Sequence, residues 1–320
     1  METKVQHALF EEDTLRGLTS PKKYLLPKYF YNKKGSQIFQ DIMAMPEYYL
    51  TDCEFQIFSD QSASICQNLI PGNTPFELIE LGPGDGLKSR ILLKALAKKQ
   101  TDFTYLPVDI SKHALNELSC NLTKEIPGIS IRKKAGDFFR IMQELSAENG
   151  INKVILFLGS NIGNFLAEER DKFLSLLKAM TVSGDKALIG FDKKKDPEVI
   201  LKAYDDPHGH TRNFNLNHLI RINEELNADF NIEDFAHHSS YDPVSGAVKS
   251  YLVSTKDQTV HIGHTETTIE FKKWEPIFME LSQKFNDNDI RTLAQRFGFE
   301  VQENFTDKNH FFTDSLWVKI

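Results

Sequence analysis

Residues 76–86 read Phe-Glu-Leu-Ile-Glu-Leu-Gly-Pro-Gly-Asp-Gly, an apolar stretch that runs directly into a glycine-rich turn. The apolar part, residues 76–81, has the length of a buried strand, and residues 88–98 after the turn carry a helical pattern. Glycine has no Cβ, so the backbone of such a turn can bend tightly and approach a ligand closely. The stretch therefore predicts a strand, a ligand-binding turn and a helix, in that order.

The same alternation of strands and helices continues along the chain. It predicts strands at residues 103–108, 129–133, 154–158 and 187–191, with helices that begin after Ser111, after Asp137 and at Glu168. Near the C-terminus, a helix around residues 287–297 precedes two strands at residues 299–305 and 311–320. Strands separated by helices form parallel βαβ units in a doubly wound sheet. Five such units followed by a terminal antiparallel pair are the pattern of a class I methyltransferase (Rossmann-like) α/β fold.

Two segments do not follow this alternation. Residues 193–285 predict helices at 197–203 and 216–226, and then an antiparallel meander of period-two strands at 235–240, 248–254, 258–262 and 267–271. Residues 1–51 are an aromatic-rich lead-in with a helix that stops at Pro46. We therefore expect two domains, one from residues 52–192 and 286–320, and an inserted α+β domain from residues 1–51 and 193–285.

Acidic residues follow three successive strands of the predicted sheet, at the edge where ligands bind in this architecture. Glu80 lies at the end of the first strand, two residues before the turn Gly82–Gly86, which has the spacing GxGxG; Leu87 stands where the dinucleotide pattern GxGxxG needs its last glycine. Asp109 ends the second strand and suits two ribose hydroxyls, whereas Asp137 and Phe138 end the third and suit an adenine ring. Each aspartate alone is better explained as a helix N-cap. Together with the turn, they predict a site for S-adenosylmethionine.

Composition and charge argue against other classes of function. The 320 residues carry a formal net charge of −7, which lacks the positive field that attracts nucleic acid. The longest apolar run, residues 154–158, is too short to cross a membrane, and the polar residues 1–20 do not resemble a signal peptide. The spacing of the cysteines and histidines predicts no disulfide and no metal site. We expect a cytoplasmic protein without nucleic-acid, membrane or obligate protein partners.

Several segments, in order from about residue 21 to the C-terminus, carry a resemblance to a known family. They are Lys28-Tyr-Phe-Tyr-Asn-Lys-Lys-Gly-Ser-Gln-Ile-Phe39, Met45-Pro-Glu-Tyr-Tyr-Leu-Thr51, Phe157-Leu-Gly-Ser-Asn-Ile-Gly-Asn-Phe165, Ala203-Tyr-Asp-Asp206, Asn213-Phe-Asn-Leu-Asn217 and Asn223-Glu-Glu-Leu-Asn-Ala-Asp-Phe230. They resemble the histidine-specific S-adenosylmethionine-dependent methyltransferases of ergothioneine biosynthesis. The resemblance implies methyl transfer to the α-amino nitrogen of L-histidine, up to trimethylated hercynine. It also implies that residues 52–192 and 286–320 bind S-adenosylmethionine and that the inserted domain binds the amino acid.

The resemblance also assigns residues to the site. Cofactor-binding positions are matched by the turn glycines Gly82 and Gly84 and by Lys88, Asp109, Asp137 and Phe138. Positions around the amino and carboxylate groups of the acceptor are matched by Tyr31, Tyr48, Asn164 and Tyr204, among which Tyr31 and Asn164 are the candidates for catalysis. The pair that contacts the imidazole ring is matched by Glu280 and Ser282. A carboxylate beside a hydroxyl can satisfy both nitrogens of an imidazole, which a substrate without those donors cannot replace.

The chain departs from the family pattern, and two alternatives stay open. Its Gly-Pro-Gly-Asp-Gly turn replaces a Ser/Thr-rich version, Asn161 replaces a threonine, and Ser250 stands where a methionine lines the imidazole pocket. Ser250 leaves open another amino acid or an aromatic amine as the acceptor. The other alternative is a non-catalytic sensor of S-adenosylmethionine or of an amino acid, against which the intact turn and Asp109 argue.

Overall fold

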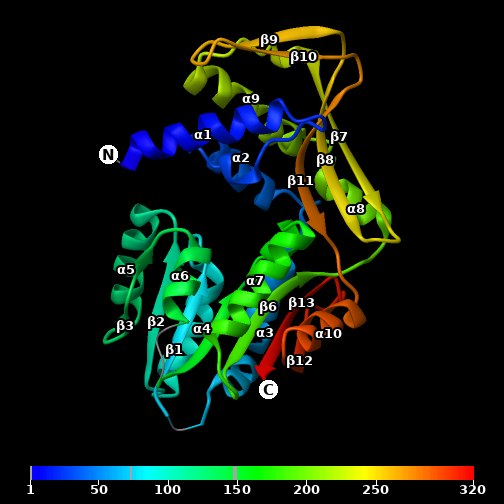
Figure 1. Cartoon of the computed structure of the whole chain (residues 1–320). Coiled ribbons are helices and arrows are strands. Elements are labelled where there is room, and N and C mark those ends of the chain that lie inside the picture. Colours follow the sequence, from blue (N-terminus) through cyan, green and yellow to red (C-terminus); the bar gives the residue numbers. More distant parts are fainter. Residues whose placement is uncertain (1, 73, 147–149) are drawn as a thin grey trace. The chain divides into compact units, whose positions relative to one another are not determined.

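The computed structural model describes residues 2–72, 74–146 and 150–320, with side chains from residue 7 onward. The chain divides into two compact units, whose elements are labelled in Figure 1. Unit 1 comprises Met1–Tyr49 and Lys195–Ser282, and unit 2 comprises Leu50–Lys194 and Gln283–Ile320. These boundaries lie a few residues from the ones expected above. Each unit has its own sheet and its own hydrophobic core.

Unit 2 is built on one sheet with the strand order β12-β13-β6-β5-β1-β2-β3, in which β4 also pairs with β2. The strands are β1 (Phe76–Leu81), β2 (Phe103–Asp109), β3 (Ser130–Ile131), β4 (Lys134–Ala135), β5 (Asn152–Phe157), β6 (Lys186–Asp192), β12 (Phe299–Thr306) and β13 (Phe312–Lys319). The pairs formed among β1 to β6 are parallel, whereas β13 lies antiparallel to both β6 and β12. This arrangement confirms the class I methyltransferase fold.

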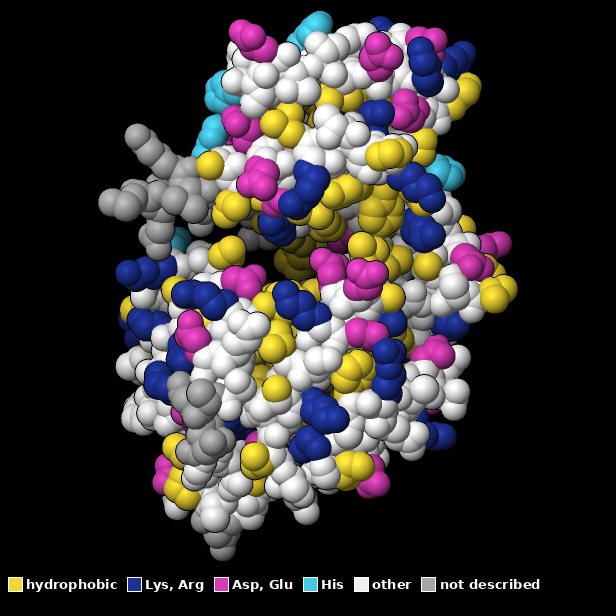
Figure 2. All heavy atoms as spheres, in the orientation of Figure 1, with side chains coloured by type: hydrophobic (Ala, Val, Ile, Leu, Met, Phe, Trp, Pro, Cys, Tyr) yellow, Lys and Arg dark blue, Asp and Glu magenta, His cyan; other side chains and the backbone are white. Residues whose placement is uncertain are grey.

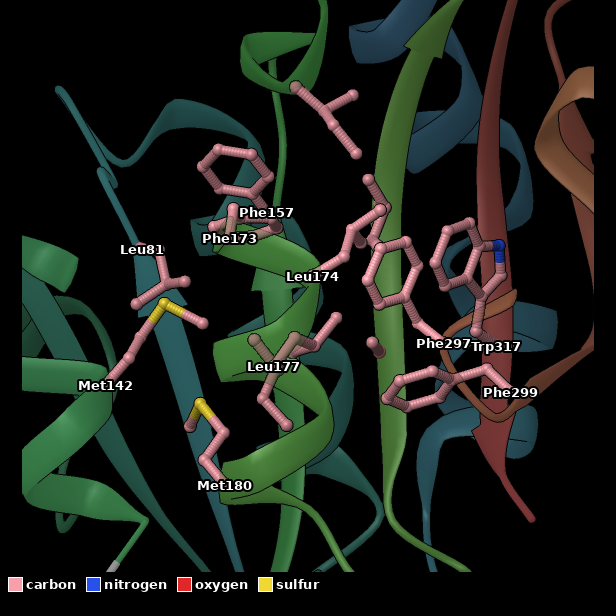
Figure 3. Close-up of a cluster of buried hydrophobic side chains, with 14 of the residues drawn as sticks. Leu81, Met142, Phe157, Phe173, Leu174, Leu177, Met180, Phe297, Phe299 and Trp317 are labelled. Atoms are coloured by element: carbon pink, nitrogen blue, oxygen red, sulfur yellow. The ribbon is translucent and has the colours of Figure 1, made fainter. Parts of the chain in front are cut away.

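Helices cover both faces of this sheet. They are α3 (Tyr49–Leu69), α4 (Leu87–Lys98), α5 (Lys112–Glu125), α6 (Phe138–Leu145), α7 (Ala167–Met180) and α10 (Asp287–Arg296). Side chains of α6, α7 and α10 pack on one face, where Figure 3 shows Met142 of α6 and Leu177 of α7 in the same core as Trp317 of β13. Ile189 and Phe191 of β6 belong to this core. Because side chains alternate along a strand, Gly190 between them faces the other side of the sheet, where α3 lies.

Unit 1 combines helices with two small antiparallel sheets. Its elements are α1 (Glu2–Leu18), η1 (Pro27–Tyr29), α2 (Lys33–Ala44), α8 (Pro197–Tyr204), α9 (His210–Leu226), η3 (Ile232–Asp234), β7 (Phe235–Asp242), β8 (Ala247–Ser254), β9 (Gln258–Ile262), β10 (Thr267–Phe271) and β11 (Pro276–Gln283). One sheet has the order β11-β8-β7, and the other pairs β9 with β10. Apolar side chains of α1, α2, α9 and the strands form its core, and Phe214, Leu219 and Ile222 of α9 are among them.

Five local features differ from the expectations. The strand expected at residues 129–133 is replaced by the two-residue strands β3 and β4, whose side chains are half-buried or exposed. The expected single meander is absent from the described residues, because β9 and β10 form their own sheet and β8 takes β11 as its second neighbour. Strand β11 was not predicted from the sequence, because Glu280, Ser282 and Gln283 interrupt its apolar pattern. Helix α1 was not expected, and α9 begins at His210 rather than near residue 216.

Charges of both signs share the surface. On the face shown in Figure 2, Lys and Arg side chains are interspersed with Asp and Glu side chains rather than gathered into one positive field. Among the described residues, no helix combines the length and the apolar character that crossing a membrane requires.

Candidate active site

The carboxyl ends of four parallel strands meet at one edge of the sheet in unit 2. The register pairs Leu81 of β1 with Val108 of β2, and Glu80 with Leu156 of β5. Asp109 of β2 pairs in turn with Ala135 of β4. The glycine turn, Asp109, Asp137 and the loop after β5 therefore all begin at this edge, where an open α/β sheet binds its ligands.

The glycine turn adopts backbone angles that favour glycine. Gly82, Gly84 and Gly86 have φ values of 71°, 58° and 69°, all in the left-handed region. A Cβ added at Gly82 or Gly84 would meet no atom within 4 Å, so the turn borders open space. A Cβ on Gly86 would instead lie 2.3 Å from Leu118 Cδ1, so that this glycine also serves packing against α5. The first two glycines thus leave room for a ligand beside the backbone.

Asp109 and Asp137 are both held by backbone N–H groups. Asp109 Oδ1 accepts a hydrogen bond of 2.8 Å from the Ser111 N–H, and partial burial raises the pKa of this carboxyl despite that bond. The exposed Asp137 caps α6, since its Oδ1 accepts from the Arg140 N–H at 3.1 Å. The structure therefore shows the N-cap role for Asp137, and a carboxylate retains capacity for a ligand beside one such bond. Phe138 stacks on Phe139, with 4.6 Å between ring centroids, and is only partly buried.

Lys88 lies at the start of α4 and forms an ion pair with Glu54 of α3. Glu54 is 1% exposed, and its Oε1 accepts a 2.7 Å hydrogen bond from the Gly159 N–H. Burial alone would lower the pKa of Lys88, but the Glu54 carboxylate raises it above its ordinary value, so Lys88 is a cation at neutral pH. Sequence reasoning missed Glu54. The available signal was an acidic residue inside the buried stripe of α3 that includes Leu50, Cys53, Ile57 and Phe58.

The loop after β5 is fixed by its own hydrogen bonds and by close packing. Ser160, with φ 56°, accepts a 2.9 Å bond from the Asp192 N–H, and Asn161 Nδ2 donates to the Leu158 carbonyl at 2.8 Å. A Cβ on Gly163 would lie 2.7 Å from the Gln283 carbonyl oxygen. The loop thus holds Asn164, the last residue of η2 (Asn161–Asn164), at the ligand edge of the sheet.

Unit 1 brings together the predicted acceptor residues that belong to it. The buried Tyr204 hydroxyl, at the end of α8, is 2.8 Å from the Ser282 hydroxyl of β11. Tyr31 is half exposed, yet partial desolvation and the negative charge of Glu280, two residues before Ser282 on β11, raise the pKa of its hydroxyl. Tyr31 and Tyr48 both contact Phe39, with centroid separations of 5.4 and 6.3 Å.

Two polar side chains near Tyr204 were missed by sequence reasoning. The Tyr204 carbonyl accepts hydrogen bonds from Ser239 Oγ at 2.8 Å and from His237 Nε2 at 3.0 Å. Ser239 lies opposite Ser250 in the β7–β8 register, with 3.5 Å between their hydroxyl oxygens. Ser250, one of the positions expected to depart from the family pattern, is therefore buried beside a second serine. No sequence pattern indicates these contacts, because only the tertiary fold brings His237 and Ser239 of β7 close to Tyr204.

Comparisons with known proteins identify the family of the chain. Residues 10–319 match the family model described as histidine-specific methyltransferase, SAM-dependent. The chain is 33% identical over 98% of its length to the histidine N-alpha-methyltransferase of Mycobacterium tuberculosis, 96% of which is covered. It is 33% identical over 96% of its length to the protein of the same name from Mycolicibacterium smegmatis, with 94% covered. It is 30% identical over 89% of its length to ergothioneine biosynthesis protein 1 of Schizosaccharomyces pombe, of which it covers 38%.

The family match spans nearly the whole chain, and it agrees with the fold of unit 2 and with the turn and acids at its ligand edge. Open space beside Gly82 and Gly84, and the carboxylate of Asp109 at the same edge, suit a nucleoside with a ribose. The chain therefore belongs to the histidine-specific, S-adenosylmethionine-dependent methyltransferases, is an N-methyltransferase, and has S-adenosylmethionine as its cofactor.

Proposed function

We propose that this enzyme transfers methyl groups from S-adenosylmethionine to the α-amino nitrogen of L-histidine, up to trimethylated hercynine. L-Histidine as the acceptor is supported by a group of polar side chains in unit 1. The Tyr204 and Ser282 hydroxyls lie 2.8 Å apart there, and Glu280 is on the same strand as Ser282. A carboxylate and a hydroxyl on one strand suit the two nitrogens of an imidazole. We place the reaction in the cytoplasm on the sequence grounds given above.

Unit 2 is proposed to bind the cofactor, which supplies an electrophilic methyl group on its sulfonium. Asp109 accepts hydrogen bonds from ribose hydroxyls, and Asp137 and Phe138 contact the adenine. The turn at Gly82 and Gly84 lets the nucleoside approach the backbone. Lys88, a cation at neutral pH, suits the carboxylate of the cofactor's amino-acid end.

The residues that match the acceptor positions of the family are proposed to bind the amino acid. The Tyr204 hydroxyl and the Asn164 amide are each suited to its carboxylate, because both groups donate hydrogen bonds. Glu280 and Ser282 contact the imidazole ring. Tyr48 contributes an aromatic face that tolerates the growing quaternary ammonium. These contacts select which nitrogen faces the methyl group, and positioning of this kind supplies most of the acceleration in a direct transfer.

Tyr31 is proposed to orient the amine. Its raised pKa keeps the hydroxyl protonated at neutral pH, so Tyr31 is not a phenolate base. A neutral hydroxyl can still accept from an amine N–H and fix the direction of the nitrogen lone pair. The negative charge of Glu280, which contributes to this pKa shift, also favours a substrate whose imidazole side chain donates hydrogen bonds.

A screen of acceptors tests this proposal. The enzyme is incubated with methyl-labelled S-adenosylmethionine and each of the twenty amino acids, and products are read by mass for one, two or three added methyl groups. Product from histidine alone supports the proposal. Product from tryptophan or another amine, without histidine, identifies a different acceptor, and the absence of product with every amino acid contradicts the proposal.

Replacing Glu280 tests the acceptor residues separately from the cofactor site. Glu280→Ala should raise the KM for histidine by roughly 10- to 100-fold, the range for a lost hydrogen bond to a charged group, while the KM for S-adenosylmethionine stays within about twofold. Glu270→Ala is the matched control, because Glu270 is an exposed glutamate of β10 in the same unit. A change in cofactor KM with no change in histidine KM would show that Glu280 is wrongly placed.

A further inference from the structure

Glu54 of α3 is a buried carboxylate that touches two parts of the proposed site. One oxygen, Oε2, pairs with Lys88, and the other, Oε1, accepts the 2.7 Å hydrogen bond from the Gly159 N–H. Lys88 lies in the first turn of α4, just after the glycine turn, and Gly159 lies in the loop between β5 and η2, which ends at Asn164. The same carboxylate therefore links the lysine proposed for the cofactor to the loop that carries an acceptor residue.

The sheet is shaped to receive this carboxylate. A Cβ on Gly190 of β6 would lie only 2.7 Å from Glu54 Oε1, so the absence of a side chain at Gly190 makes the space. Asp314 of β13 is the register partner of Gly190. Cross-strand partners place their side chains on the same face of a sheet, within about 5.5 Å of one another. The Asp314 carboxyl therefore lies beside the Glu54 carboxylate, and both are at most 1% exposed.

The adjacent carboxyl groups of Glu54 and Asp314 require one proton between them. Among the described residues no donor bonds either carboxyl oxygen of Asp314, so an ionised Asp314 would be an unpaired buried charge next to Glu54. Such a charge is costly, and two adjacent carboxylates do not both ionise. Burial and the neighbouring Glu54 raise the pKa of Asp314 well above its ordinary value, although Lys88 opposes this shift. Glu80 of β1 also faces Lys88, but it is an acid whose own pKa is raised by burial to about 7 and whose carboxyl accepts a hydrogen bond from the Tyr105 hydroxyl, so it brings no positive charge to this pair.

We propose that Glu54 is a positioning residue that sets Lys88 and the Gly159 loop together, and that a protonated Asp314 locks Glu54 by donating a hydrogen bond to it. The proton balance is simple: the proton stays on Asp314, and the ion pair between Glu54 and Lys88 is kept. Glu54 touches neither substrate in this scheme and acts through Lys88 and the loop. The inference rests on the cofactor role proposed for Lys88.

The test measures binding of S-adenosylhomocysteine by calorimetry, which needs no acceptor and so is independent of the choice of histidine. Glu54→Gln keeps an oxygen for the Gly159 N–H but removes the charge that faces Lys88. We expect it to weaken binding roughly 10- to 100-fold, the range for a lost charge-assisted hydrogen bond. Glu168→Gln, at an exposed glutamate of α7 in the same unit, is the matched control and should bind as the unaltered enzyme does.

Two comparisons distinguish positioning from a general loss of structure. Because Glu54 acts through Lys88, adding Glu54→Gln to Lys88→Met should weaken binding by less than about twofold beyond Lys88→Met alone. Asp314→Asn, whose amide mimics a protonated carboxyl, should bind within about threefold of the unaltered enzyme, whereas Asp314→Ala should lose affinity clearly. Additive effects of the Glu54 and Lys88 changes, or equal losses in Asp314→Asn and Asp314→Ala, would overturn the inference. Unaltered binding by Lys88→Met would overturn it together with the cofactor role of Lys88, while leaving the acceptor screen untouched.

Discussion

Replacing Gly190 by alanine gives a stability change whose sign depends on the packing of Glu54. The added methyl carbon would lie 2.7 Å from Glu54 Oε1, 3.1 Å from Phe312 Cζ and 3.2 Å from the Gly159 nitrogen. Glu54 cannot withdraw freely, because its two oxygens hold Lys88 and the Gly159 N–H. Overpacking of this kind costs roughly 1–3 kcal/mol. Without the clash, alanine would stabilise the protein by roughly 0.4–1 kcal/mol, since glycine loses more chain entropy on folding.

Differential scanning calorimetry decides between these signs. For a unit of this size, the loss corresponds to a fall in Tm of roughly 2–12 °C. The double variant Glu54→Ala/Gly190→Ala should be less destabilised than the sum of the two single changes, because removal of the Glu54 carboxylate frees the space that the methyl needs. A Tm for Gly190→Ala that equals or exceeds that of the unaltered enzyme would refute the packing described here, and so would strict additivity in the double variant.

Two further predictions concern hydrogen bonds and pH. Tyr204→Phe and Ser282→Ala each remove one partner of the 2.8 Å bond between the two hydroxyls, so each change should raise the KM for histidine. The double variant should show a coupling free energy of about 0.5–1.5 kcal/mol between the two changes. A coupling free energy of zero would contradict the shared hydrogen bond. Burial raises the pKa of Glu80 from 4.5 to about 7, against the hydrogen bond from the Tyr105 hydroxyl, so the folded enzyme keeps this proton to higher pH than the unfolded chain does. The stability that this proton contributes is complete below pH 4.5 and is lost as pH rises through about 7, by an amount on the order of 3 kcal/mol. Urea unfolding at pH 5 and pH 8 should therefore show a smaller pH dependence for Glu80→Gln than for the unaltered enzyme, and parallel curves would show that Glu80 is ionised throughout.

Local patterns predicted most of the sheet in unit 2. Strand β1 has the bounds expected from its apolar run, and Ser111 and Asp137 cap the helices that follow β2 and β4. These features depend on neighbours in the sequence, such as a short apolar run bounded by glycines or a capping side chain three residues before an N–H group. Strand β11 was missed for the converse reason. Its backbone pairs with β8, and its Ser282 hydroxyl lies 2.8 Å from the Tyr204 hydroxyl of α8, and neither contact can be read from a local pattern.

The sequence by itself determined the fold class and the family, because periodicity, glycine spacing and the order of motifs are properties of the chain itself. It also predicted that the glycine turn, Asp109 and Asp137 bind the cofactor. Only the tertiary structure decided which charges meet. Glu54, Lys88 and Asp314 come from a helix, a second helix and the last strand, and Tyr204 and Ser282 are 78 residues apart. The free energy of a buried charge depends on which partners share its low-dielectric surroundings, and those partners are chosen by packing rather than by order in the sequence.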